Sequence, residues 1–280
     1  MEGEKTAEQY VAVADRMYAP TLSNREVSQR ISALGIKKAN TKNWQLLLLG
    51  LLAGAYIGVG AHLFLVAMQA GMGRIVSGAV FGVGLVLVVV AGAELFTGNI
   101  IMVVGTITRQ FSLAQMLRNW IVVYVGNMSG SFLLVFLVWH SGLLVRNGSP
   151  TELGAFAAQT AAAKLQLSFS EAFCRGILCN MLVVLAIIMA ILSKDVISKI
   201  ACCVLPIMAF VASGFEHCVA NMYLLPAGLS ASGMPVADQT VILQNLVPVT
   251  LGNIVGGIGI LLLHPNRIRQ ILVLVKGEET

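Results

Sequence analysis

Six long apolar stretches divide this chain, and they constrain its fold more than any other feature of the sequence. They run over Trp44–Met68, Ile75–Ala93, Asn119–Trp139, Ala172–Leu192, Ile197–Ser213 and Val241–Leu263. A helix of about 20 apolar residues is long enough to cross the hydrocarbon core of a bilayer. Only 11% of the residues are charged, whereas a soluble domain has about 25%, so a soluble enzyme and a nucleic-acid-binding domain are poor fits. We therefore expect an all-α membrane protein with six transmembrane helices.

The second and fifth stretches are the shortest, and each runs into a polar cluster before a brief apolar stretch resumes. The two resumptions are Ile100–Ile107 and Met222–Leu229. Both patterns indicate helices that break within the membrane. Non-helical backbone is tolerated at that depth only where it lines a polar cavity or is buried in protein. The two breaks are therefore the first places to look for a function.

Lysine and arginine gather in the segments that would lie on the same side of the membrane as the N-terminus. The opposite side holds only Arg74, Arg146, Lys164 and Arg175, out of 18 basic residues in all. Basic residues concentrate in cytoplasmic loops, so we expect a multi-pass protein of the cell's inner (plasma) membrane with both termini in the cytoplasm. The expected divisions are a cytoplasmic N-terminal segment at 1–43, a channel domain at 44–264 and a cytoplasmic tail at 265–280.

An internal repeat links the two halves of the channel domain. The pattern Gly92-x-Glu94-x-x-x-x-Asn99 recurs as Gly214-x-Glu216-x-x-x-x-Asn221. The third span carries Asn119 followed by Gly126-Asn127-x-x-Gly130, and the sixth carries Asn245 followed by Gly252-Asn253-x-x-Gly256. The third and sixth spans are related by an offset of 126 positions. At that offset Gly50 matches Gly176, and Gly54 stands opposite Asn180. Three matches in the same order indicate a duplication, with repeats at about 44–140 and 170–264.

Each repeat holds three spans, and an odd number requires the second copy to insert upside down relative to the first. We therefore expect two inverted three-helix repeats, with the second and fifth helices broken. Many transporters use this arrangement, and their solute site lies near the midplane of the bilayer, where the broken helices meet.

The ionisable residues at the two breaks need a physical reason, because charge is costly inside a membrane. Glu94 and Glu216 occupy equivalent positions, so we expect them to be structural acceptors for backbone N–H groups at the breaks. Asn99, Asn221 and Asn253 are further polar groups of the breaks.

His217 differs from these residues because Leu95 occupies the matching position in the first repeat. An imidazole titrates near neutral pH and can donate to an anion, so His217 is the strongest candidate for a solute contact. Thr97 supplies a hydroxyl for an oxyanion or for neighbouring backbone. Asn180 adds an amide that faces either the helix bundle or the pore.

The longest loop between spans carries an alanine-rich piece, Ala155–Ala163, which ends at Lys164. Alanine favours helix, so we expect a short helix on the outer face, with Lys164 either solvated or attracting anions. Phe81, Leu85 and Phe210 precede the breaks by a few turns and form either apolar gates or ordinary packing.

At these residues the sequence resembles the formate/nitrite transporter family. Ala93-Glu94-Leu95-Phe96-Thr97-Gly98-Asn99 is similar to the family's second-span signature, and Val211-Ala212-Ser213-Gly214-Phe215-Glu216-His217-Cys218-Val219-Ala220-Asn221-Met222 is similar to its fifth-span signature. Gly252-Asn253-Ile254-Val255-Gly256-Gly257 resembles the sixth-span pattern. The likeness extends over roughly residues 38 to 263.

The resemblance implies an aquaporin-like fold in a homopentamer with one pore through each protomer. It places Thr97 and His217 at the pore centre, between two apolar constrictions. The residues matched to the constrictions are Phe81, Leu85, Phe210, Leu95 and Phe96. Lys164 matches a lysine of the outer vestibule, and Asn180 matches a pore-side asparagine.

The resemblance further implies a channel or transporter for small monovalent weak-acid anions. We expect formate and nitrite as solutes, with hydrosulfide, lactate or acetate as alternatives, and protons and lipid as the other partners. Either the anion takes up a proton through His217 or from water and crosses as the neutral acid, or a protonated His217 holds the anion directly. No cofactor, metal or nucleic-acid partner is expected.

Two other classes share parts of this pattern. A water or glycerol channel needs two Asn-Pro-Ala boxes, which Asn99-Ile100-Ile101 and Asn221-Met222-Tyr223 do not provide. An intramembrane serine protease needs a GxSG-type turn near its histidine, and neither Ser129-Gly130 nor Ser213-Gly214 has the glycine two positions before the serine. The five cysteines have no metal-ligand spacing. We therefore expect a channel and no enzyme.

Overall fold

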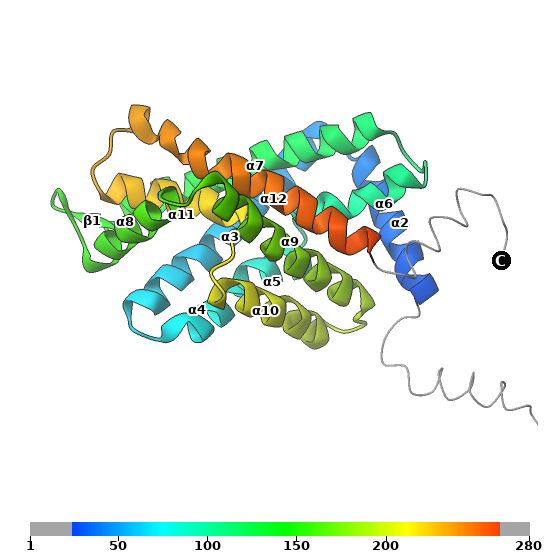
Figure 1. Ribbon diagram of the computed structural model, residues 1–280, viewed down its shortest axis with the longest axis horizontal. Helices are drawn as coiled ribbons and strands as arrows, with labels where there is room; N and C mark the ends of the chain where they lie inside the picture. The colour runs from blue at the N-terminus through cyan, green and yellow to red at the C-terminus, as the bar shows by residue number, and fades with distance from the viewer. Residues whose placement is uncertain (1–23, 264–280) are drawn as a thin grey trace, which may run out of the picture.

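A computed structural model of the protein describes residues 24–263, so the start of the expected N-terminal segment and the expected tail at 265–280 lie outside it. The described chain is mostly helical (Figure 1). Five of its helical segments are long and apolar enough to cross a membrane. These are α3 (Asn43–Gln69), α4 and α5 together (Gly73–Val90), α7 (Leu113–His140), α9 (Phe169–Leu192), and η2 and α12 together (Val236–Leu262). The protein is therefore an integral membrane protein.

The expected spans agree with these helices to within a few residues, except that the second is divided, the third begins earlier and the fifth, Ile197–Ser213, matches a helix too short to be among the five. Residue Gly82 divides the second span into α4 (Gly73–Phe81) and α5 (Val83–Val90). At this point the backbone lies close to α10 (Val196–Ala212), where a Cβ on Gly82 would come within 3.0 Å of the Val204 Cα. The third span begins six residues earlier than expected, because Ser112 and Gln115 form a capping box at the start of α7. α10 has 17 residues, fewer than the roughly 20 of a full span.

Helices α5 and α10 end in the same local structure. Gly92 and Gly214 follow them with φ of 84° and 73°, a left-handed conformation that glycine adopts without steric cost. The next residue then bonds back across the helix end, from Ala93 N to Val88 O and from Phe215 N to Phe210 O. This is the Schellman stop. The sequence pattern that begins with glycine therefore marks two equivalent helix ends.

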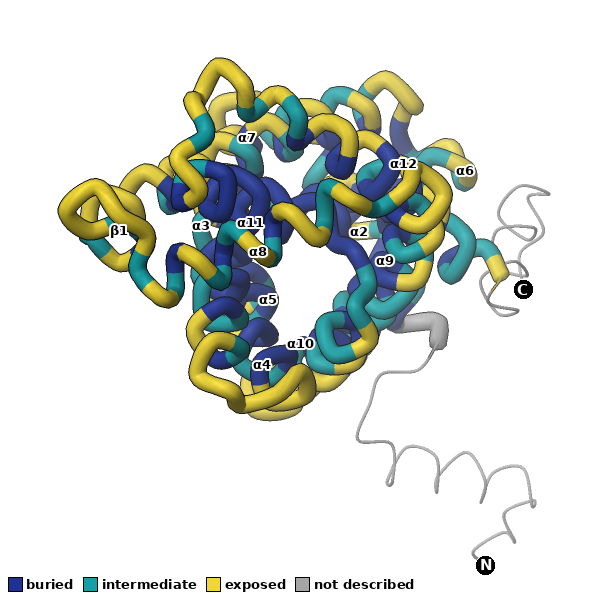
Figure 2. The backbone as a smooth tube through the Cα atoms, turned by 60° about the vertical axis from the view of Figure 1, so that its left-hand side comes forward, coloured by how far each residue is buried: buried dark blue, intermediate teal, exposed yellow. Residues whose placement is uncertain are grey.

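The chain becomes helical again after each stop, but the two halves differ in how this happens. After the first stop a 3₁₀ helix, η1 (Gly98–Ile101), leads into the short helix α6 (Met102–Ile107). After the second stop, only three residues intervene before α11 (Cys218–Ala231), which runs for 14 residues. Nearly all of α11 is buried, and Figure 2 shows it in dark blue in the interior of the molecule.

Small residues allow the longest helices to pack closely in pairs. α3 packs against α7, and α9 packs against α12 (Leu243–Leu262). A Cβ on Gly54 would collide with the carbonyl oxygen of Asn127, and one on Gly252 would collide with that of Phe173. Helix association in membranes depends on this kind of close approach, since lipid leaves no hydrophobic drive between helices.

Two short helices occupy opposite ends of the molecule (Figure 1). α2 (Asn24–Asn40) packs against α6 at one end, which we call the α2 end. α8 (Glu152–Leu165) packs against α11 at the other, the α8 end, and contains the expected alanine-rich helix. A two-residue antiparallel hairpin, β1 (Val145–Arg146) and β2 (Ser149–Pro150), precedes α8.

Candidate functional site

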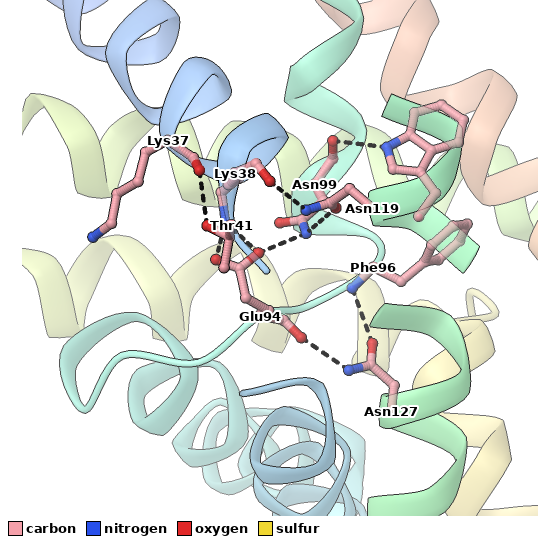
Figure 3. Close-up of polar contacts among 9 residues, drawn as sticks. Lys37, Lys38, Thr41, Glu94, Phe96, Asn99, Asn119 and Asn127 are labelled. Carbon is pink, nitrogen blue, oxygen red and sulfur yellow. Dashed lines mark hydrogen bonds and ion pairs between the residues drawn. The ribbon is translucent and has the colours of Figure 1, made fainter. Parts of the chain in front are cut away.

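The break in the first half is held by an ion pair within a polar cluster (Figure 3). Lys38 Nζ, from the end of α2, lies 2.7 Å from Glu94 Oε2 and 2.8 Å from Glu94 Oε1. Asn99 Nδ2 donates to Glu94 Oε2 at 2.7 Å and to Asn119 Oδ1 at 2.8 Å. Asn119 in turn donates to the backbone carbonyl of Lys38 at 3.2 Å. The cluster therefore ties α2, the break and α7 together.

Asn127 of α7 supports the backbone on the other side of the same break (Figure 3). Its Oδ1 accepts from Phe96 N at 2.9 Å. Its Nδ2 donates to the carbonyls of Glu94 and Gly50, at 2.9 and 2.8 Å. One buried side chain thus satisfies two backbone groups of the break, Phe96 N and Glu94 O, and also ties α7 to α3 through the Gly50 carbonyl.

The break in the second half repeats both arrangements with other residues. Lys164 Nζ of α8 donates to Glu216 Oε1 at 2.8 Å. The remaining bonds run from Asn221 Nδ2 to Glu216 Oε2 and Asn245 Oδ1, from Asn245 Nδ2 to Lys164 O, from Cys218 N to Asn253 Oδ1, and from Asn253 Nδ2 to Glu216 O and Gly176 O. We call the residues that recur in this way the frame. The frame consists of Lys38, Glu94, Asn99, Asn119 and Asn127, and of Lys164, Glu216, Asn221, Asn245 and Asn253.

The frame differs from the sequence expectation in which groups its carboxylates bind. Glu94 and Glu216 accept from lysine and asparagine side chains, whereas Asn127 and Asn253 accept the backbone N–H groups. A carboxylate that leaves water needs an opposite charge to offset its desolvation, and a backbone N–H alone does not supply one. Lys164, which the sequence left as either solvated or attracting anions, is thus paired with Glu216, and its side chain retains 16% exposure.

Three polar residues at the breaks have no polar equivalent in the other half. Thr97 stands opposite Val219, His217 opposite Leu95, and Asn180 opposite Gly54. The structure brings these three together, and each is buried. Thr97 Oγ1 lies 2.9 Å from His217 Nε2, and Asn180 Nδ2 lies 3.4 Å from the carbonyl oxygen of Thr97. The three residues that have no polar equivalent in the other half thus form one cluster, which we call the central cluster.

His217 has its ring orientation set by the backbone. It is the N-cap of α11, and its Nδ1 accepts a hydrogen bond from Ala220 N at 3.1 Å. In a neutral imidazole only one nitrogen carries hydrogen, so that hydrogen is on Nε2 and is donated to Thr97 Oγ1. Leu95, the matching residue of the first half, offers no such acceptor, and there the chain becomes helical later and through a 3₁₀ turn.

Aromatic side chains lie next to His217 of the central cluster. The Phe210 ring stacks on His217 with centroids 5.9 Å apart, and Phe81 meets Phe210 edge-on at 5.8 Å. The ring of Phe96 packs edge-on against Trp120 and Tyr124 of α7. Leu85 and Leu95 are buried.

Sequence reasoning missed Lys38. It stands 126 positions before Lys164, the offset that relates the spans, so the repeat itself contained the signal. Asn119 and Asn245 were recognised as repeated, but their role in holding Asn99 and Asn221 was not.

Within residues 24–263, no group of three or more His, Cys, Asp or Glu side chains is placed to hold a metal ion.

Comparison with known proteins identifies the family. The family model described as formate/nitrite transporter matches residues 25–265. The chain is 40% identical over 257 residues to a probable formate transporter of Methanothermobacter thermautotrophicus, covering 84% of this chain and 92% of the relative. It is 37% identical over 244 residues to the formate channel FocA of Haemophilus influenzae, covering 79% of this chain and 85% of the relative. These relatives are channels and transporters and not enzymes, as expected.

Solved structures give the same result. A pentameric formate channel with formate bound matches with a TM-score of 0.68 at 32% identity, over 84% of this chain and 98% of the other. An FNT family ion channel matches with a TM-score of 0.73 at 31% identity, over 84% of this chain and 95% of the other. The resemblance noted in the signature motifs is therefore confirmed, and the chain belongs to the formate/nitrite transporter family.

Proposed function

We propose that this protein is a membrane channel for small monovalent weak acids, with formate as its main solute and nitrite as the next. The central cluster is the observation that carries the proposal, because it places a hydroxyl, an imidazole and an amide together in a buried site that the repeat does not require. Relatives and a solved structure named for formate support formate as the solute.

The proposed architecture has six spans in two inverted halves, with α10 and α11 together as the fifth. The positions of α2 and α8 at opposite ends support this arrangement. Tyr124 and Thr250 occupy equivalent positions, and their hydroxyl groups lie 2.9 Å apart. Equivalent positions meet each other only close to a symmetry axis, so this contact supports a two-fold axis between the halves. The α2 end faces the cytoplasm of an inner (plasma) membrane protein, and five protomers assemble as in the pentameric neighbour.

A lysine at each end draws the anion toward the centre. Lys38 and Lys164 are paired with glutamates but keep 14% and 16% side-chain exposure. An ammonium has three N–H donors, and one of them stays available to a passing anion beside the paired glutamate. Beyond it, the anion loses hydration among apolar side chains, including Phe81, Leu85, Phe210 and Leu95, at a cost that rises as the dielectric falls.

Protonation relieves that cost, because a neutral acid is far easier to desolvate than its anion. The proton comes from water and leaves to water on the other side, so it travels with the acid. His217 contributes as a donor. If His217 gave its single N–H proton to the solute, the ring would become an imidazolate. If it took a second proton on Nδ1, it would lose the hydrogen bond that Ala220 N donates to that atom. This argument favours neutral-acid passage over a charged His217 that holds the anion.

The test is a flux assay on proteoliposomes with separate gradients of formate, nitrite, hydrosulfide and lactate. We expect formate and nitrite to move faster than in protein-free liposomes, and we expect His217→Ala to reduce that flux. His140→Ala is the matched control, since His140 lies at the exposed end of α7. If no weak acid moves with the wild-type protein, the proposal fails. Faster movement of hydrosulfide than of formate would transfer the solute assignment to hydrosulfide.

A further inference from the structure

The turn between α2 and α3 carries positive charge that the frame does not use. Lys37, in the last turn of α2, and Lys42, just before α3, are both exposed. Arg118 of α7 lies beside them, because its Nη2 donates to the carbonyl oxygens of Ala39 and Thr41 at 2.7 and 3.0 Å. Three cationic side chains therefore gather where the chain passes from α2 to α3. We call Lys37, Lys42 and Arg118 the basic junction.

The basic junction has no carboxylate partner among the side chains that the structure describes. The ion pairs there join Lys38 to Glu94 and Lys164 to Glu216. Figure 3 shows the Lys37 side chain extending away from Lys38 and Glu94, so Lys37 does not share their ion pair. The charge of the basic junction thus stays available to an anion from outside the chain.

The second half of the protein lacks this charge at the equivalent place, between α8 and α9. The offset of 126 positions puts uncharged residues opposite the basic junction and opposite Trp44. They are Ala163 for Lys37, Ser168 for Lys42, Gln244 for Arg118 and Ser170 for Trp44. The second half nevertheless holds its break with the same frame. The basic junction is therefore not needed to hold a helix break, and its charge serves a different purpose.

Trp44 and two leucines give this charge an apolar border. Trp44, in the first turn of α3, is 60% exposed, and Leu48 and Leu52 are exposed on the same face of the helix at intervals of four residues. Tryptophan gathers at the boundary between the hydrocarbon core and the lipid headgroups. The surface therefore passes from cationic groups to an indole and then to apolar side chains, which is the order that a phospholipid requires from its headgroup to its acyl chains.

We propose that the basic junction binds the phosphate headgroup of an anionic phospholipid, whose acyl chains lie along Trp44, Leu48 and Leu52. This inference rests on the proposed orientation of the channel, with the α2 end in the cytoplasm, where the leaflet carries anionic lipid and a negative surface potential. Phosphate oxygens accept short, charge-assisted hydrogen bonds from ammonium and guanidinium groups. A lipid held there stabilises α2, whose Lys38 pairs with Glu94 at the first break.

The test measures lipid binding to the purified full-length protein by native mass spectrometry and by the unfolding midpoint in micelles. Phosphatidylglycerol should bind and raise the midpoint, whereas phosphatidylcholine with the same acyl chains, which has no net charge, should do so much less. We expect the double variant Lys37→Gln/Lys42→Gln to bind phosphatidylglycerol about 30-fold more weakly, at about fivefold for each lysine. Lys42 makes no side-chain cap bond to α3, and Arg118 stays in place to hold the turn.

The matched control is Arg74→Gln/Arg146→Gln. It removes the same charge from two exposed residues at the α8 end, and it should bind phosphatidylglycerol as wild type does. Lys37→Arg/Lys42→Arg keeps the charge of the basic junction and should also bind as wild type does. Retained binding by this variant separates the loss of a charged contact from a failure to fold.

Three results would overturn the inference. Equal binding of the two lipids by wild type would show that the headgroup is not selected. An equal loss in the Arg74 and Arg146 control would show that net charge alone decides binding. Equal protection by inorganic phosphate would show a site for free anions and not for lipid. The assay measures binding and not flux, so a protein that binds phosphatidylglycerol here but moves no weak acid would contradict the proposed function alone.

Discussion

The hydroxyl of Thr97 lies 2.9 Å from Nε2 of His217, although the two residues are 120 positions apart in the chain. Each stands at a helix break where the other half of the protein has an apolar residue, Val219 for Thr97 and Leu95 for His217. The lysine, glutamate and asparagine residues of the frame, by contrast, recur in both halves. The comparison of the two halves therefore distinguishes the frame, which holds the breaks, from the central cluster, to which we assign the solute.

The first prediction separates the two roles of His217, as a helix cap and as a donor. Asparagine is among the best N-cap residues, so His217→Asn should retain the cap on α11 while it removes the imidazole Nε2. We expect His217→Ala to lower the free energy of unfolding by about 1 kcal/mol more than His217→Asn. Denaturant titration in micelles measures the difference.

Both variants should lose formate flux, because neither presents an N–H donor to Thr97 in the same place. Full flux through His217→Asn would show that the imidazole is needed only to start the helix. Retention of the wild-type oligomer on size exclusion is required of both variants before their fluxes are compared.

The second prediction concerns the ion pair between Lys38 and Glu94. Removing one member of a largely buried pair leaves the other charge uncompensated, which costs about 3 kcal/mol. We expect Lys38→Met and Glu94→Gln each to destabilise the protein by that order, and the double variant to lose less than the sum of the two. A double-mutant cycle on unfolding free energies measures the coupling.

The control for this cycle is the exposed contact between Gln69 and Glu152. Glu152→Gln should change stability by no more than about 0.5 kcal/mol. A coupling of zero between Lys38 and Glu94 would show that the pair does not stabilise the break.

The third prediction tests the close packing of α3 on α7. Gly54→Ala places a Cβ against the Asn127 carbonyl, and the helices must separate to accept it. We expect a loss of stability of about 1–3 kcal/mol, typical of overpacking. Gly259→Ala is the matched control, because a Cβ there meets nothing within 4 Å and alanine is the better helix former. Equal effects of the two variants on the unfolding midpoint would contradict this packing.

Five of the six expected spans, and the helix ends at the two glycine motifs, were predictable from the sequence because their causes are local. Lipid demands a minimum apolar length, and a polar cluster cannot lie within such a length unless protein covers it. Glycine at 92 and 214 marks the stops for an equally local reason, since the backbone there needs a positive φ. The signature motifs were long enough to identify the family.

The partners of the charged groups were not predictable in the same way. Lys38 and Glu94 are 56 positions apart, and nothing local in either sequence segment indicates the other. The close approach of α10 to Gly82 is likewise a contact between distant segments. The direction of the Asn180 amide is not predictable for the same reason, because two carbonyls from distant segments decide it.

The most direct measurement of the central claim is formate flux through Thr97→Val in proteoliposomes. Valine has nearly the shape of threonine without its hydroxyl, and it is the residue found at the equivalent position 219. We predict a fall in formate flux of about tenfold or more, from the loss of one donor to the solute, with the oligomer and its unfolding midpoint close to wild type. Wild-type flux through a correctly assembled Thr97→Val protein would contradict the assignment of the central cluster as the solute site.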